Sequence, residues 1–218
     1  MKGDLFMTES KIINLNYMDM PINTVNNLKK YTIIDFEYVE ANRKGKKEQD
    51  ICNIAAIFVE NGKVTDVLNE WTVPLNVTSV GLVSLHTKLK AINYHFESKD
   101  MKASRYNYQE FFRRSFSWLG RYKIITNPII GWGVNTDVAT YNDLVKYLFN
   151  EEPIESKIVP LTIQDSQKCF SNILGTQDIG LGNICKLLNV DYKSDHIGLY
   201  DVRRINELMV KYHSKILS

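Results

Sequence analysis

A pair of apolar runs constrains the fold more than any other feature of this chain. Residues 54–73, IAAIFVENGKVTDVLNEWTV, are predicted to form two strands that meet at Asn61 and Gly62. An Asn-Gly pair between apolar runs is typical of the tight turn of a β-hairpin. Upstream, residues 31–36, YTIIDF, have the composition of a buried strand. These segments predict a sheet formed by the N-terminal half of the chain.

The rest of the chain carries mostly helical patterns. Residues 105–122 repeat apolar side chains at roughly helical spacing, namely Tyr108, Phe111, Phe112, Phe116 and Leu119. A short apolar run at 129–132 precedes a helix that begins near Asp137. A further strand is predicted at 156–161, and helical patterns follow at 164–174, 179–188 and 200–212. Strands followed by an alternation of strands and helices predict an α/β domain.

The composition fits one intracellular domain. With 218 residues, 44% of them hydrophobic, the chain is long enough to bury a core. We expect one domain over residues 31–218 and an N-terminal extension over residues 1–30, to which the sequence assigns no function. The 3 cysteines form no C-x-x-C pair, which argues against a disulfide framework and a zinc site. Because no secretion signal or long apolar stretch is found, we expect a cytoplasmic protein with no membrane partner.

Acidic side chains and a histidine from distant segments form a candidate site. Because side chains alternate along a strand, Asp35 and Glu37 are predicted to lie on one face and Phe36 on the other. His196 and Asp201 occur in the segment HIGLYDVRR, where a glycine permits a tight approach before the next helix. Carboxylates are preferred ligands of Mg²⁺ or Mn²⁺, and imidazole accepts a proton near neutral pH. Together these groups predict a metal-dependent hydrolase.

Each member of this set also has an ordinary explanation. An Asp-x-Glu at a strand end is often a solvated turn, and a single loop histidine more often has a structural role. Asp137, which follows the glycine-containing segment GWGVNT, can simply cap a helix. The combination is much less expected by chance than any one member.

The order and spacing of these motifs resemble the DEDDh 3′-to-5′ exonucleases, which include RNase T and the proofreading subunit of bacterial DNA polymerase III. Asp35 with Glu37 resembles the first motif, Asp137 the second, and His196 with Asp201 the third. The segment HIGLYDVRRI is most similar to the Eri and KapD branch, whose members trim RNA 3′ ends. The resemblance covers about residues 31–212. It implies a ribonuclease H-like mixed sheet flanked by helices.

The resemblance also implies a role for each motif residue. Asp35 would bridge two Mg²⁺ or Mn²⁺ ions, Glu37 and Asp201 would complete the coordination of one ion, and Asp137 would support the other. His196 would deprotonate the attacking water. The implied products are nucleoside 5′-monophosphates, and the implied partner is single-stranded or 3′-overhanging nucleic acid, with RNA favoured. The net charge of +2 permits such a partner without requiring it.

Three residues are candidates for substrate contact: Phe36, Tyr38 and Leu89. Phe36 is better explained as a core residue, and Tyr38 can either stack on a base or simply pack. Leu89 begins a segment that reads LKAI where the resembled family has L-T-G-I, a change that affects recognition of the substrate end. Asn53 stands where the family usually has a glutamate.

Other expectations remain open at this point. A basic run, formed by Arg43, Lys44, Lys46 and Lys47, either reaches a phosphate backbone or is a solvated loop. The leading function is a 3′-to-5′ exoribonuclease. The alternatives are a DNA exonuclease of the same chemistry and a non-catalytic nucleic-acid binding protein with the same fold. A homo-oligomer is compatible with the sequence.

Overall fold

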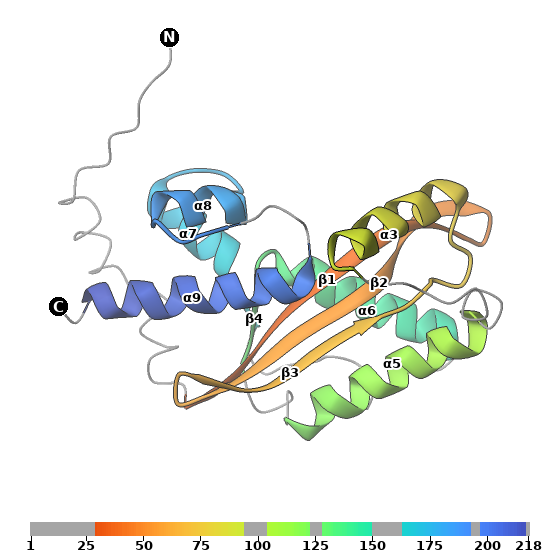
Figure 1. Cartoon of the computed structure of the whole chain (residues 1–218), viewed down its shortest axis with the longest axis horizontal. Helices are drawn as coiled ribbons and strands as arrows, with labels where there is room; N and C mark the ends of the chain where they lie inside the picture. The colour runs from red at the N-terminus through yellow and green to blue at the C-terminus, as the bar shows by residue number, and fades with distance from the viewer. Residues whose placement is uncertain (1–28, 94–103, 123–127, 150–162, 193–196, 217–218) are drawn as a thin grey trace, which may run out of the picture.

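The computed structural model describes residues 29–93, 104–122, 128–149, 163–192 and 197–216 (Figure 1). The strands in these residues are β1 (Lys30–Arg43), β2 (Lys46–Glu60), β3 (Lys63–Trp71), β4 (Ile129–Gly131) and β5 (Ile163–Asp165). The helices are α3 (Ser79–Ala91), α5 (Ser104–Arg121), α6 (Val134–Phe149), α7 (Ser166–Leu174), α8 (Leu181–Leu187) and α9 (Gly198–Ile216).

The strands form one mixed sheet in the order β3-β2-β1-β4-β5. β2 runs antiparallel to both β1 and β3, whereas β4 is parallel to β1 and to β5. The register of β1 against β2 shifts after Glu37, because Glu37 pairs with Asn53 whereas Tyr38 pairs with Ile51. Cys52 is therefore the extra residue of a β-bulge. β1, the central strand, carries the first acidic motif.

Both hairpin turns use two residues with positive φ angles. Asn61 and Gly62 have φ values of 51° and 75°, which confirms the turn predicted from the sequence. Lys44 and Gly45, with φ values of 52° and 78°, form an equivalent turn between β1 and β2. Such turns match the right-handed twist of the strands they join. The basic run therefore lies at the tip of the first hairpin.

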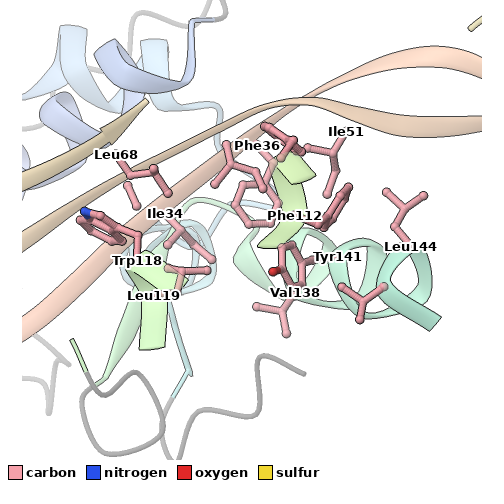
Figure 2. Packing of buried hydrophobic residues seen from close by; sticks show 14 of the residues in the cluster. Ile34, Phe36, Ile51, Leu68, Phe112, Trp118, Leu119, Val138, Tyr141 and Leu144 are labelled. Carbon is pink, nitrogen blue, oxygen red and sulfur yellow. The ribbon is translucent and has the colours of Figure 1, made fainter. Parts of the chain in front are cut away.

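Helices cover both faces of the sheet (Figure 1). Alternation along β1 sends Ile34 and Phe36 to the face covered by α5 and α6, where they pack with Phe112 and Tyr141 (Figure 2). Ile33 faces the opposite core, which is formed mainly by α7, α8 and α9. A third, smaller core lies under α3. The expected mixed sheet flanked by helices is thus confirmed.

Several local expectations need adjustment. α3 was not predicted, because few of its residues are buried and two valines at positions 80 and 83 are exposed. α6 begins at Val134, ahead of the predicted start, and α9 begins at Gly198. The strand predicted at 156–161 lies outside the described residues, as does nearly all of the extension predicted at 1–30. None of the described helices is both long and apolar enough to span a membrane.

Candidate metal centre

Three carboxylates from two distant segments converge at the centre of the sheet. Asp35, Glu37 and Asp201 each place one oxygen within 4.8 Å of the others. Asp35 and Glu37 share a face of β1, and Asp201 lies in the first turn of α9. Glu37 and Asp201 are nearly buried, with 6% and 7% of their surface exposed. The structure therefore brings these three predicted site residues together.

Gly198 allows α9 to approach the sheet this closely. A Cβ atom at this position would lie 2.7 Å from Asn53 Oδ1, 2.9 Å from Ala55 Cβ and 3.2 Å from Asp35 Oδ2. The first two distances are shorter than real Cβ contacts, so a side chain here would push α9 away from the sheet. The glycine thus helps to bring Asp201 to the first-motif acids.

Asp137 adds a fourth acidic group from the first turn of α6. It lies outside the group of three, but its charge acts on Asp35, and Glu37 acts on Asp137 in turn. The Tyr38 hydroxyl donates a hydrogen bond to Asp137 Oδ1. In this structure Tyr38, one of the candidate substrate residues, therefore contacts Asp137 and helps to position its carboxylate.

Burial and mutual repulsion make these acids hard to ionise. Burial is the main cause that raises the pKa of Glu37 to about 7 and that of Asp137 to about 7. The pKa of Asp35 is raised well above its usual value, first by burial and then by the charges of Asp137, Asp201 and Glu37. A nearby positive charge favours the ionised carboxylates, and so it offsets both the burial and the mutual repulsion. The centre therefore favours a bound cation.

Lys88 supplies one such positive charge. Its Nζ atom lies 2.5 Å from Glu37 Oε2, and 18% of the lysine side chain is exposed. The contact lowers the pKa of Glu37, although burial outweighs it. Sequence reasoning did not identify Lys88. The only available signal was its place directly before the altered LKAI segment.

Tyr192 and Asn53 are two further residues at the centre that sequence reasoning did not assign to it. Burial raises the pKa of Tyr192, and a hydrogen bond to Asp201 adds to the shift. The Asn53 amide donates to Asn69 Oδ1 at 3.0 Å and to the Glu70 carbonyl at 2.8 Å. Its own Oδ1 is buried without a hydrogen-bond partner among the residues described. A neutral amide here avoids adding one more negative charge to the centre.

Two of the candidate substrate residues are buried in the protein core. Phe36 is 4% exposed and its ring lies 5.9 Å from that of Tyr141, as its place on the opposite face of β1 predicted. Leu89 is 2% exposed and packs in the core beneath α3. Neither side chain offers surface to a substrate in this structure. His196 falls in residues 193–196, outside the described part of the chain.

The donor set fits a hard divalent cation. Mg²⁺ and Mn²⁺ prefer carboxylate oxygens, and the described residues offer three of these within reach of one another. A bound cation would also remove the cost of holding buried acids ionised side by side. Asp35, Glu37 and Asp201 are the residues that would hold it, with Asp137 beside them.

No protein-family model and no curated protein sequence matches this chain. Among solved structures, one described as "3′-end specific recognition of histone mRNA stem-loop by 3′-exonuclease" aligns with a TM-score of 0.59 and 13% identity. The alignment covers 84% of this chain and 63% of that one, so this chain spans less than two thirds of its length. The RNase domain of the yeast Pop2 protein aligns with a TM-score of 0.49 and 11% identity, over 96% and 84% of the two chains. This chain therefore shares the ribonuclease H-like fold found in a 3′-exonuclease.

Proposed function

We propose that this chain is a Mg²⁺- or Mn²⁺-dependent 3′-to-5′ exonuclease that removes nucleoside 5′-monophosphates from nucleic acid, preferentially RNA. The convergence of Asp35, Glu37 and Asp201 on a fold shared with a 3′-exonuclease carries the proposal. The preference for RNA rests on the motif resemblance to the Eri and KapD branch. The structural neighbour, whose description names an mRNA stem-loop, is consistent with it.

The proposed reaction is the hydrolysis of the last phosphodiester bond. The water oxygen bonds to phosphorus, the bond from phosphorus to the 3′ oxygen of the preceding nucleotide breaks, and that oxygen takes up a proton. Two divalent ions at the centre would neutralise the phosphoryl oxygens and stabilise the leaving oxygen. Asp35, Glu37, Asp137 and Asp201 would hold this charge in place. On the motif match alone, His196 would take the proton of the attacking water.

The direct test is product analysis on matched 12-nucleotide RNA and DNA strands labelled at either end. With Mg²⁺ or Mn²⁺, the 5′-labelled RNA should shorten stepwise and the 3′-labelled RNA should release a labelled mononucleotide at once. Addition of a chelator should stop both reactions. Faster digestion of the DNA strand would overturn the RNA preference, and internal fragments as the first products would overturn the exonuclease assignment.

One contact favours a second candidate, a non-catalytic nucleic-acid binding protein. Lys88 occupies an oxygen of Glu37, one of the proposed metal ligands, and thus supplies positive charge without a metal. If purified protein bound the labelled strands but released no mononucleotide with either ion, this second function would replace the first.

A further inference from the structure

The tip of the first hairpin borders a hollow of about 650 Å³ on the surface. Four cationic and two acidic side chains and one aromatic ring line it, namely Arg43, Lys44, Lys46, Lys146, Glu48, Asp143 and Tyr147. These residues come from the ends of β1 and β2 and from the C-terminal half of α6. None of them belongs to the candidate metal centre.

The walls of the hollow are held in place by Arg43. Its Nε atom lies 2.8 Å from the buried carboxylate of Asp50, and its guanidinium lies 6.0 Å from the centre of the Tyr147 ring. Arg43 also lies 3.7 Å from Glu48. The arginine is therefore occupied by protein acids and serves to join the hairpin to α6.

The lysines at the turn are placed differently. Lys44 and Lys46 flank Gly45, both are exposed, and no acidic partner lies within ion-pair distance of either among the described residues. Lys47, the last member of the basic run, instead pairs with Glu40 at 3.3 Å. The two lysines thus direct uncompensated positive charge toward a hollow that also contains an aromatic ring. Cations combined with an aromatic face are the features that bind single-stranded nucleic acid.

The hollow and the metal centre both lie where β1 meets α6, at two different positions along these elements. β1 and α6 contact each other at the centre through Tyr38 and Asp137, and again at the hollow through Arg43 and Tyr147. At about 1.5 Å per residue, α6 spans about 15 Å between Asp137 and Tyr147. At about 3.4 Å per nucleotide of a stacked strand, this distance corresponds to about four nucleotides.

We infer that this hollow binds the phosphate backbone of a nucleic-acid strand about four nucleotides upstream of the 3′ end held at the metal centre. This inference rests on the proposed function and adds a second contact to it. Lys44 and Lys46 neutralise phosphates, and Tyr147, whose ring Arg43 already approaches, lines the hollow beside them. A strand long enough to reach both places therefore binds more tightly than a dinucleotide.

The test compares the double variant K44Q/K46Q with a matched control, K29Q/K63Q. Lys29 and Lys63 are exposed lysines beside the other hairpin turn, so both variants lose the same charge. Fluorescence anisotropy with a 12-nucleotide oligouridylate in a chelator measures binding without cleavage. Cleavage of this strand and of a uridine dinucleotide with Mg²⁺ gives the length dependence.

For K44Q/K46Q, we expect about tenfold weaker binding of the 12-nucleotide strand. The slope of log affinity against log salt should fall by about 1.4, since each phosphate contact of a single strand contributes about 0.7. The preference of kcat/KM for the longer strand over the dinucleotide should fall in parallel. K29Q/K63Q should match the wild type in each measurement.

Equal binding and equal length preference in K44Q/K46Q and in the wild type would overturn the inference. If the wild type cleaved the dinucleotide and showed no preference for longer strands, the inference would fail while the proposed function stood. A wild type that cleaved neither substrate would overturn the proposed function itself. The single variant K44Q, with an expected slope change of about 0.7, repeats the test with a smaller perturbation.

Discussion

Asp66 on β3 and Asp137 on α6 both accept a hydrogen bond from a tyrosine hydroxyl, yet their pKa values shift in opposite directions. Asp66 also accepts from Trp118 Nε1 at 3.1 Å and from its neighbour's backbone N–H, and the bond from Tyr122 is the main cause that lowers its pKa. Burial raises the pKa of Asp137 to about 7 despite the bond from Tyr38.

The difference separates Asp66, whose ionised form is favoured by folding, from Asp137, whose ionised form is disfavoured by folding. Asp66 lies near the surface, surrounded by donors, so its charged form is favoured in the folded protein. Asp137 is buried beside other acids, so its charged form is disfavoured until a cation arrives. Groups with such unfavourable ionisation are concentrated at functional sites. The comparison therefore supports the cluster around Asp35 as the candidate functional site.

The sharpest test of this contrast exchanges one acid from each region for its amide. D35N should lose about 1,000-fold or more in nuclease activity, because several kcal/mol of charge stabilisation depend on the metal ligands. The same change should raise the melting temperature of metal-free protein, since it removes a half-buried charge that the neighbouring acids repel. D66N should keep its activity and lose about 1.5 kcal/mol of stability through its weakened hydrogen bonds. Retained Mg²⁺-dependent cleavage by D35N would contradict the site assignment.

The pH dependence of stability offers a second test. Glu37 and Asp137 have raised pKa values in the folded state, so folded protein holds more protons than unfolded protein between about pH 4 and 7. Stability without metal should therefore fall as the pH rises through this window, on the order of 3 to 4 kcal/mol for each of the two groups, since one pKa unit corresponds to about 1.4 kcal/mol. Differential scanning calorimetry at pH 5 and pH 8, with and without Mn²⁺, measures this. A Mn²⁺-induced rise in melting temperature that did not grow with pH would contradict it.

A side chain added at Gly198, where α9 approaches the sheet most closely, should lower stability and weaken the metal centre. In G198A the new methyl group would meet Asn53, Ala55 and Asp35, at a cost of about 2 kcal/mol for overpacking. Displacement of Asp201 should also weaken Mn²⁺ binding, measured by isothermal titration calorimetry. G120A is the matched control, because a Cβ at Gly120 in α5 meets nothing within 4 Å. Equal Mn²⁺ affinity in G198A and wild type would show that the approach does not position Asp201.

A further prediction concerns Lys88. In K88M the carboxylate of Glu37 loses its ion pair, so metal-free protein at pH 8 should be less stable than the wild type. Because a cation no longer competes for Glu37, the rise in melting temperature on adding Mn²⁺ should exceed that of the wild type. K90M removes an exposed lysine of the same helix and should leave both values unchanged. A smaller Mn²⁺ effect in K88M would indicate that the lysine assists metal binding.

Local rules were enough to predict the strand at 31–36, the hairpin at 54–73 and the meeting of the acids. The period of two along β1 placed Asp35 and Glu37 together, and the glycine in HIGLYD indicated the close approach that brings Asp201 to them. Lys88 could not be predicted in the same way. Its role depends on how α3 packs, and α3 shows too narrow an apolar stripe to be recognised from the sequence.

The same limitation applies to substrate contact. Leu89 was chosen because of its place in a motif, but that motif lies within a helix whose packing buries the side chain. The Lys44–Gly45 turn was also missed, because polar and charged residues surround it and an apolar pattern was the guide. Positions set by tertiary packing or by polar turns were thus the ones that local sequence patterns did not predict.

The extra residue at Cys52 divides the first hairpin into two independent registers. On one side the pairing of Glu37 with Asn53 holds the acids, and on the other the pairing of Arg43 with Lys46 closes the turn. The bulge leaves one residue of β2 unpaired and bends the strand between these two sets of pairs. Adding or removing residue pairs at the tip would therefore change the length of the hairpin, while Asp35 and Glu37 kept their positions. The hairpin tip can therefore change while the part of β1 that carries Asp35 and Glu37 keeps its pairing.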